Sequence, residues 1–176
     1  MGLIERLKQT GRRVAETLAG DESTGDRDIL DTLKQDHDDI ATLLDRLGAS
    51  GTASERKALL TAVRRVLVPH LRAEEKTVYD PILALRRNAP KEHGEEGYLE
   101  HGLADKTLAS LFKIDDPMAV EFAAGVKVLR DLVAHHFEEE ETNVWADLRE
   151  HFPAAQRAAM NRQFAAAKKR LRVPGG

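Results

Sequence analysis

The sequence contains no cysteine, so disulfide bonds, thiolate metal sites and cysteine nucleophiles are all excluded. It also lacks any run of about 20 apolar residues, the length that a transmembrane helix needs, and the unbroken apolar stretch of a signal peptide. The charges nearly cancel, with 30 acidic and 27 basic residues, which argues against a surface built for nucleic acid. These absences predict a soluble cytoplasmic protein with no transmembrane segment and no nucleic-acid partner.

Strand-like alternation is also scarce, and apolar residues recur instead at the spacing of helices. The 176 residues are enough for one domain with a sizeable core. The predicted fold is all-α, an antiparallel up-down-up-down four-helix bundle at 28–151 with short accessory terminal helices. An N-terminal amphipathic helix and linker take up 1–27, and a C-terminal basic helix and tail take up 152–176. For 1–27, packing on the bundle is favoured over an anchor at a membrane surface.

Each of the four long helices carries an apolar stripe. The first helix is expected at about 28–47 and the third at about 95–113, and the fourth is expected to start near Pro117. Ser54 is the expected N-cap of the second helix. Pro69 lies inside that helix and removes a backbone donor, so a kink is expected there.

Polar residues interrupt these stripes at matching places. His70-x-x-x-Glu74 and His136-x-x-x-Glu140 are two copies of one motif, 66 residues apart. Residues four apart in a helix share a face, so each motif directs an imidazole and a carboxylate toward one point. Burying such groups is costly unless they are paired or bind metal. We therefore predict a metal site whose ligands come from all four helices: His37, His70, Glu74, His101, His136 and Glu140.

Other polar residues near the stripes have weaker patterns. Asp105, one turn after the third-helix histidine, is a tentative seventh ligand. Tyr98 is expected either to reach the site as a hydrogen-bond donor or to serve in packing. The remaining histidines are expected outside the site: His93 in a loop around Pro90, His135 about 100° away from its stripe, and His151 at a helix end. The neighbouring glutamates are expected to be surface charges or outer acceptors: Glu75, Glu138, Glu139 and Glu141.

The ligand set also restricts the metal. Six or seven nitrogen and oxygen ligands exceed the four that a structural zinc ion takes, and imidazole with carboxylate suits iron, with manganese or zinc less suited. Two adjacent ions would use the set economically, with Glu74 and Glu140 bridging and the histidines binding terminally. Such a site leaves coordination positions open for an exogenous ligand.

The order of these residues resembles that of the hemerythrin family, specifically its HHE cation-binding domains, over about Asp28 to Glu150: His37, His70-x-x-x-Glu74, His101, His136-x-x-x-Glu140. The resemblance implies a non-haem di-iron centre in an up-down-up-down bundle, bridged by two carboxylates and an oxo or hydroxo group. It further implies binding of O2 and, in some members, reaction with nitric oxide or peroxide, or iron sensing. Oxygen carriers have a second histidine where this chain has Asp105. Reversible O2 transport is therefore disfavoured, and peroxide or nitric oxide chemistry, or oxidation of the bound metal, is favoured.

Several alternatives stay open at this point. Ferritin-like sites use Glu-x-x-His pairs, so the order and spacing here disfavour that ancestry. The chain could bind O2, nitric oxide or peroxide, could be a di-iron enzyme that removes peroxide or nitric oxide, or could store or buffer iron. A metal that serves only stability, and a bundle without metal, are the remaining hypotheses.

The C-terminal helix, expected at 154–171, is basic and has no acidic residue. A solvated tail that complements the helix dipole is the favoured interpretation. A protein partner that binds this helix is the alternative, and its candidate contact residues are Arg157, Arg162, Lys168, Lys169 and Arg170.

Overall fold

The computed structural model describes residues 27–171, and within this range it contains helices and no strand. The prediction of an all-α fold is confirmed. The N-terminal amphipathic helix and linker predicted for 1–27 lie, up to residue 26, outside the described residues. No helix in the described range has the length and apolar character needed to cross a membrane.

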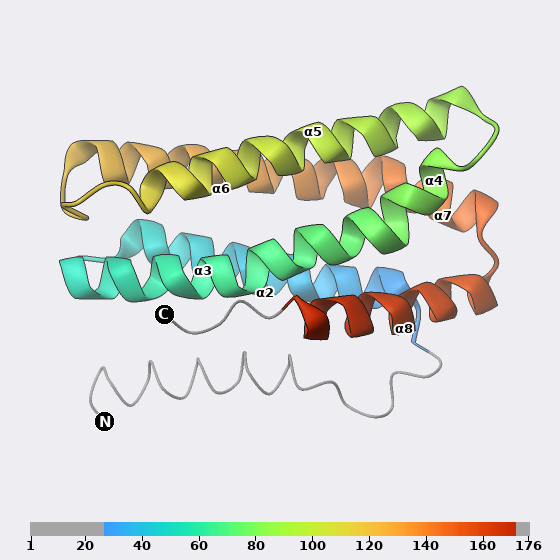
Figure 1. Ribbon diagram of the computed structural model, residues 1–176, viewed down its shortest axis with the longest axis horizontal. Helices are drawn as coiled ribbons and strands as arrows, with labels where there is room; N and C mark the ends of the chain where they lie inside the picture. Colours follow the sequence, from blue (N-terminus) through green and yellow to red (C-terminus); the bar gives the residue numbers. More distant parts are fainter. Residues whose placement is uncertain (1–26, 172–176) are drawn as a thin grey trace.

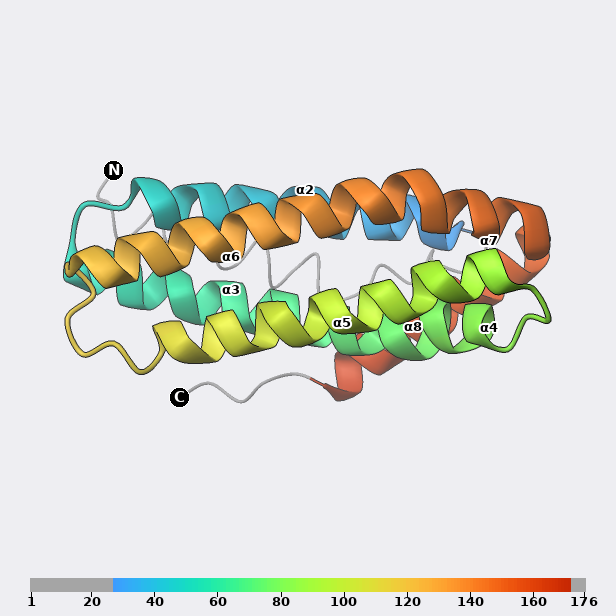
Figure 2. The same ribbon diagram turned by 90° about the horizontal axis from the view of Figure 1, so that it is seen from above.

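Four long helices lie lengthwise beside one another (Figure 1): α2 (Ile29–Ala49), α3 (Ala53–Glu74), α5 (Asn88–Leu111) and α6 (Val120–Glu139). Helix α2 packs against α3 and α6, and α5 packs against α6 and α3. Seen from above, α6 runs along α2 and α5 runs along α3 (Figure 2). Each long helix therefore has two long neighbours, and the inward stripes of all four share one core.

The predicted stripes of the first, second and fourth helices are buried along their whole length. The N-termini of α2 and α3 are each capped by a short polar side chain. The Asp28 carboxylate accepts a hydrogen bond from the Leu30 amide at 3.1 Å, and the Thr52 hydroxyl accepts one from the Glu55 amide at 3.2 Å. Thr52, and not the predicted Ser54, therefore caps α3.

Two short π-helices lie at the ends of the two His-x-x-x-Glu motifs: the first begins one residue after Glu74, and the second begins at Glu140 itself. They are η1 (Glu75–Tyr79) and η2 (Glu140–Val144), and they lead into α4 (Asp80–Leu83) and α7 (Trp145–His151). A π-helical turn holds more residues than an α-helical turn and is often found at functional sites. The wider turns change which residues face inward after each motif. Tyr79 and Trp145, which each lie five residues after the glutamate of a motif, are both buried.

Two predicted boundaries are wrong. Helix α5 begins at Asn88, so Pro90 and His93 lie in its first turns and not in a loop. Proline is tolerated there because the first amides of a helix have no intrahelical partner. Helix α6 begins at Val120, and Pro117 lies in the preceding turn.

Helix α8 (Ala154–Arg170) has nearly the predicted bounds, but it is not a solvated tail. It packs against α2 and α3, and its Phe164 is fully buried. The Arg157 guanidinium donates to the Asp28 carboxylate at 2.8 Å, and Lys168 pairs with Asp36. The basic charge on this face of α8 therefore neutralises one carboxylate of α2 and the carboxylate of its N-cap residue.

The apolar core is divided into two clusters. One includes Ile40, Leu67, Leu108 and Leu129 from the four long helices. The other gathers residues from the opposite end, from α4, α7 and α8, among them Phe164. The predicted ligands lie in sequence between members of the two clusters. The fold therefore places a polar group between two apolar layers.

Candidate metal centre

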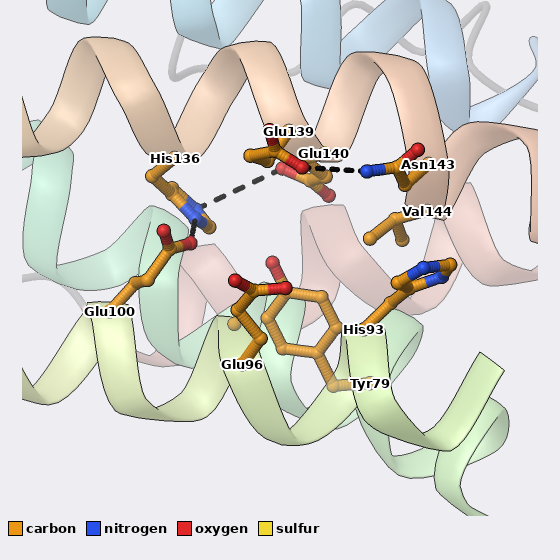
Figure 3. A pocket seen from close by; sticks show the side chains of 10 residues that line it. Tyr79, His93, Glu96, Glu100, His136, Glu139, Glu140, Asn143 and Val144 are labelled. Atoms are coloured by element: carbon orange, nitrogen blue, oxygen red, sulfur yellow. Dashed lines mark hydrogen bonds and ion pairs between the residues drawn. The ribbon is translucent and has the colours of Figure 1, made fainter. Parts of the chain in front are cut away.

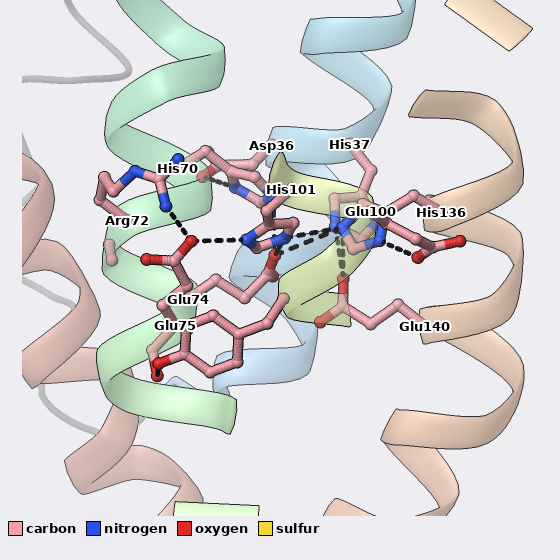
Figure 4. A network of polar contacts seen from close by, with 12 residues as sticks. Asp36, His37, His70, Arg72, Glu74, Glu75, Glu100, His101, His136 and Glu140 are labelled. Carbon is pink, nitrogen blue, oxygen red and sulfur yellow. Dashed lines mark hydrogen bonds and ion pairs between the residues drawn. The ribbon is translucent and has the colours of Figure 1, made fainter. Parts of the chain in front are cut away.

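The six predicted ligands come together in the core, and we call them the inner group: His37, His70, Glu74, His101, His136 and Glu140. Each is at most 3% exposed, although two are carboxylates. Figure 4 shows the imidazoles of α2, α3, α5 and α6 converging with the two glutamates between them. For these six residues, periodicity was enough to predict that the side chains face inward.

The two glutamates of the inner group reach imidazoles from different helices: Glu74 lies near three imidazoles and Glu140 near two. One Glu74 oxygen lies 3.6 Å from His70 Nε2 and 3.3 Å from His101 Nε2, and it lies 3.6 Å from His136 Nε2. One Glu140 oxygen lies 3.3 Å from His37 Nε2 and 3.9 Å from His136 Nε2. Two overlapping trios have the spacing of metal ligands, and Glu74 belongs to both: His37, His70, Glu74 and Glu74, His101, His136.

Several of these atoms lack a hydrogen-bond partner. Among the described residues, Nε2 of His37, Nε2 of His70 and both oxygens of each glutamate have none. An unsatisfied buried polar group costs about 1–3 kcal/mol, so six such atoms in one place need another explanation. A cation would satisfy them together, and a set of imidazole nitrogens and carboxylate oxygens is one that transition metals bind. The residues present therefore fit a metal.

Each of the four inner histidines also contacts a second carboxylate through its Nδ1 atom. We call these four carboxylate–histidine pairs the outer ring. The Nδ1 atoms lie 2.8–3.1 Å from their carboxylate partners. Each pair joins two different helical segments, and the four pairs close a circuit around the bundle: Asp36–His70, Glu75–His101, Glu100–His136 and Glu141–His37. A carboxylate at Nδ1 favours the tautomer whose Nε2 lone pair faces the centre.

Sequence reasoning gave no role to two of the four outer carboxylates. Glu75 and Glu141 were expected as surface charges or outer acceptors, and the structure makes them outer acceptors. Asp36 and Glu100 were missed. The sequence did contain a signal for them, because every outer carboxylate is directly next to an inner residue in the chain. One step along a helix turns about 100°, which directs the neighbour toward the adjoining helix.

Asp105 does not join the inner group. Its carboxylate pairs with Arg72, and its side chain is 35% exposed. Tyr98 does not point into the group either, since its hydroxyl donates to the Asp80 carboxylate at 2.7 Å. The three other histidines also lie outside, each beside a carboxylate: His93 with Asp147, His135 with Glu100 and His151 with Glu150.

Tyr79, which sequence reasoning did not single out, is the tyrosine nearest the centre. Its ring centroid lies 5.2 Å from that of His101, it is fully buried, and its hydroxyl has no partner among the described residues. Gly97 makes room for it, because a Cβ there would lie 2.5 Å from Tyr79 Cζ. The available signal was that Tyr79 and Trp145 both lie five residues after a motif glutamate.

The inner histidines differ in charge when no cation is present. Burial acts to lower the pKa of His37, but the nearby carboxylates of Glu140 and Glu141, 3.3 and 2.9 Å from its ring nitrogens, raise it to about 9. Burial acts in the same direction on His136, whose carboxylate partners raise its pKa to about 10. Burial lowers the pKa of His70. Protons on two imidazoles thus stand in for part of the positive charge that a metal would bring.

The two inner glutamates differ as well. Burial acts to raise the pKa of Glu74, but the charge of His70 and the close imidazoles of His101 and His136 hold it well below its usual value. Burial and the charge of Glu74 raise the pKa of Glu140 to about 7. The second carboxylate is therefore costly to ionise next to the first, which is a second reason why the group suits a cation.

Comparison with known proteins agrees with this geometry. The family model for the hemerythrin HHE cation binding domain matches residues 28–148. A protein described as a DNA nickase, from Nostoc sp. (strain PCC 7120 / SAG 25.82 / UTEX 2576), is 25% identical over 146 residues. This alignment covers 83% of the chain and 40% of the relative, so the chain spans well under half of that protein. No solved structure matches. Because the family model covers more than half of the chain and includes the whole inner group, the chain belongs to the hemerythrin HHE cation-binding domain family.

Proposed function

We propose that this protein is a non-haem di-iron protein that binds O2, nitric oxide or peroxide at a carboxylate-bridged pair of iron ions. One observation carries the proposal. Glu74 and Glu140 have unpartnered, buried carboxylates, and each lies within 3.9 Å of imidazoles from two parts of the bundle. Carboxylates in that position are suited to bridge two ions.

In this proposal, the six inner residues are the ligands, and Asp105 is not one of them. His37 and His70 would help to hold one ion and His101 and His136 the other, and the carboxylates of Glu74 and Glu140 would lie within reach of both. Bound iron supplies redox chemistry and open coordination positions. The outer ring holds each imidazole in orientation. The Phe137 ring, stacked on His37 with centroids 3.8 Å apart, keeps water from one side.

The proposed architecture is the antiparallel up-down-up-down bundle. Its support is the packing of each long helix on two long neighbours and the short connections, of which Ser50–Thr52 is one. In such a bundle, side chains from facing helices build a site inside the core. The outer ring uses the four contacts between neighbouring helices, one pair at each.

Metal analysis together with absorption spectra tests the proposal. We expect about two iron ions per chain, and absorption bands that change when azide, nitric oxide or peroxide is added. If iron binds but the spectrum does not respond to any of these ligands, the protein stores or buffers iron instead. Catalytic loss of added peroxide or nitric oxide, above the rate with free iron, would favour the enzyme.

The nicking activity in the relative's name is not part of this proposal. The recess that reaches the inner group is lined by glutamates (Figure 3), and carboxylates repel the phosphates of DNA. A protein partner at the outward face of α8 is a separate proposal. Its exposed basic residues there include Lys169 and Arg170, and deletion of α8 followed by a pull-down would test it.

A further inference from the structure

Three of the four outer-ring pairs are covered by a basic side chain. Lys168 of α8 pairs with Asp36 at the contact of α2 and α3. Arg72 pairs with Glu75, and Lys34 lies 3.4 Å from the Glu141 carboxylate. A cation that approached the inner group along any of these three contacts would meet a fixed positive charge.

The fourth pair, Glu100–His136, lies between α5 and α6 and has no such cover. Among residues 27–171, no lysine or arginine forms an ion pair with Glu100; its other neighbour is His135, 3.7 Å away and 59% exposed. The contact of α5 with α6 is therefore the one where the outer ring meets solvent without a permanent positive charge.

A recess opens at this contact. Its walls come from α5 and from the turn of α6 into η2, with Tyr79 of η1 beside them (Figure 3). Its carboxylates range from the exposed Glu96 through the half-buried Glu139 and Glu100 to the buried Glu140. No lysine or arginine belongs to its lining. The recess thus presents a series of carboxylates from the surface to the inner group.

Two buried groups in the recess lack partners. The Tyr79 side chain is 0% exposed, and its hydroxyl has no hydrogen-bond partner among the described residues. Both oxygens of Glu140, which is 1% exposed, are also without partners. Figure 3 shows both side chains among the lining residues, with Tyr79 beside Glu96 and Glu140 on the opposite wall. Unsatisfied buried oxygens at the inner end indicate a ligand that oxygen atoms bind.

We propose that this recess is the loading site for the metal, in which Glu96 and Glu139 capture a hydrated divalent cation and pass it to Glu140. The proposal rests on the proposed function, because it requires the inner group to be the final site. Glu139 already accepts a hydrogen bond from Asn143 at 2.6 Å, which leaves its other oxygen for a cation. Glu96 has no side-chain partner within the described range.

Capture of the cation at the outer end of the recess would make its entry easier in two ways. A charged ion cannot cross an apolar bundle without a large desolvation cost. Carboxylates that line a cleft raise the local concentration of cations and speed association, by about 10–1,000-fold in favourable cases. Carboxylate and hydroxyl oxygens also replace the waters that the ion must lose on its way to the imidazoles.

The test measures the rate of Co2+ uptake by the apo full-length chain in a stopped-flow instrument, from the growth of the Co2+ absorption bands. The test variant is Glu96→Gln with Glu139→Gln. The matched control is Glu95→Gln with Glu138→Gln, which removes the same charge from exposed positions one residue earlier on the same helices and outside the recess. Circular dichroism checks that both variants remain helical.

We expect the test variant to take up Co2+ about tenfold more slowly than the unmodified chain, with the same final stoichiometry. The control should load at the unmodified rate. Uptake at the unmodified rate in the test variant, or equal slowing in both variants, would overturn the loading site. If the unmodified chain binds no Co2+, the metal function itself fails, so the two failures are distinguishable.

Discussion

The molecule supplies the inner group from two halves that match residue for residue. The first half, α2 with α3 and η1, provides His37, His70 and Glu74, and the second, α5 with α6 and η2, provides His101, His136 and Glu140. The halves differ in what surrounds them. Helix α8 covers the His70 side with Phe164 and Lys168, whereas the His136 side meets solvent at the recess.

This difference teaches that equal ligand sets need not have equal roles. The pKa of Glu74 is held well below its usual value, while burial and the neighbouring charge raise that of Glu140 to about 7. Without metal, each half has one histidine with a raised pKa, His37 and His136, but only the open half has a glutamate whose pKa is raised as well. We infer that the first half is the more preorganised and the second is the side where ions and ligands exchange.

The largest expected effect comes from removing a bridging carboxylate. Glu74→Ala and Glu140→Ala should each weaken metal binding by more than the roughly 10–100-fold typical of outer partners, and Glu74→Ala should cost more because it contacts three imidazoles. The melting temperature of the loaded protein should fall with metal content. Elemental analysis after desalting measures the metal content, and calorimetry measures the melting temperature. Exposed Glu138→Ala is the control, and unchanged metal content in both bridging variants would refute the ligand assignment.

The substitution Phe164→Ala should weaken the packing of α8 on the first half. The side chain is fully buried, and its ring centroid lies 5.7 Å from that of His70. Truncating a buried phenylalanine typically costs about 3–5 kcal/mol of unfolding free energy. Urea titration followed by circular dichroism measures this cost. Leu99→Ala, at a position that is 72% exposed, should change it by less than about 0.5 kcal/mol, and a similar small change for Phe164→Ala would contradict the packing of α8.

The outer ring allows the two halves to be compared directly. Asp36→Asn and Glu100→Gln each remove the acceptor at one Nδ1 atom and should lower metal affinity by about 10–100-fold. In the apo protein Glu100→Gln removes the pair with His136, whereas Asp36→Asn removes the pairs with both His70 and Lys168. Asp36→Asn should therefore reduce the stability of the apo protein further, by about 1–3 kcal/mol. Competition with a chelator gives the affinities, and urea titration gives the stabilities. Equal stability losses would show that α8 does not distinguish the halves.

The smallest effect is the release of protons on metal binding. Ligand imidazoles must be neutral, yet hydrogen-bonded carboxylates, opposing burial, raise the pKa of His37 to about 9 and of His136 to about 10. At pH 8 these imidazoles are protonated in the apo protein, so loading should release about two protons from them. Affinity should therefore fall as pH is lowered from 10. A pH-indicator dye in weak buffer measures the release, and loading without any would contradict the assignment of these two ligands.

Much of the centre could be predicted because a helix repeats its faces regularly. Spacings of three and four put His37 between Leu33 and Ile40, and His136 between Val133 and Glu140, which is enough to predict that these imidazoles face inward. The same argument failed for Asp36 and Glu100, because side chains at the contact between two helices belong to neither stripe.

The π-helices and the packing of α8 could not be predicted from the spacing of apolar residues, for other reasons. The burial of Tyr79 depends on a wider turn that no stripe predicts, and on the absence of a side chain at Gly97. Helix α8 is rich in alanine and has few large apolar residues, of which Met160 and Phe164 lie four apart. Its docking depends on the surface that α2 and α3 offer, which becomes visible only in the folded molecule.

The outer ring makes the two halves depend on each other. Glu75 of the first half orients His101 of the second, and Glu141 of the second orients His37 of the first across 104 positions of the chain. A protein cut between α4 and α5 would leave each fragment with one imidazole deprived of its orienting acceptor. During synthesis, the centre therefore cannot be completed until the polypeptide past Glu141 has left the ribosome.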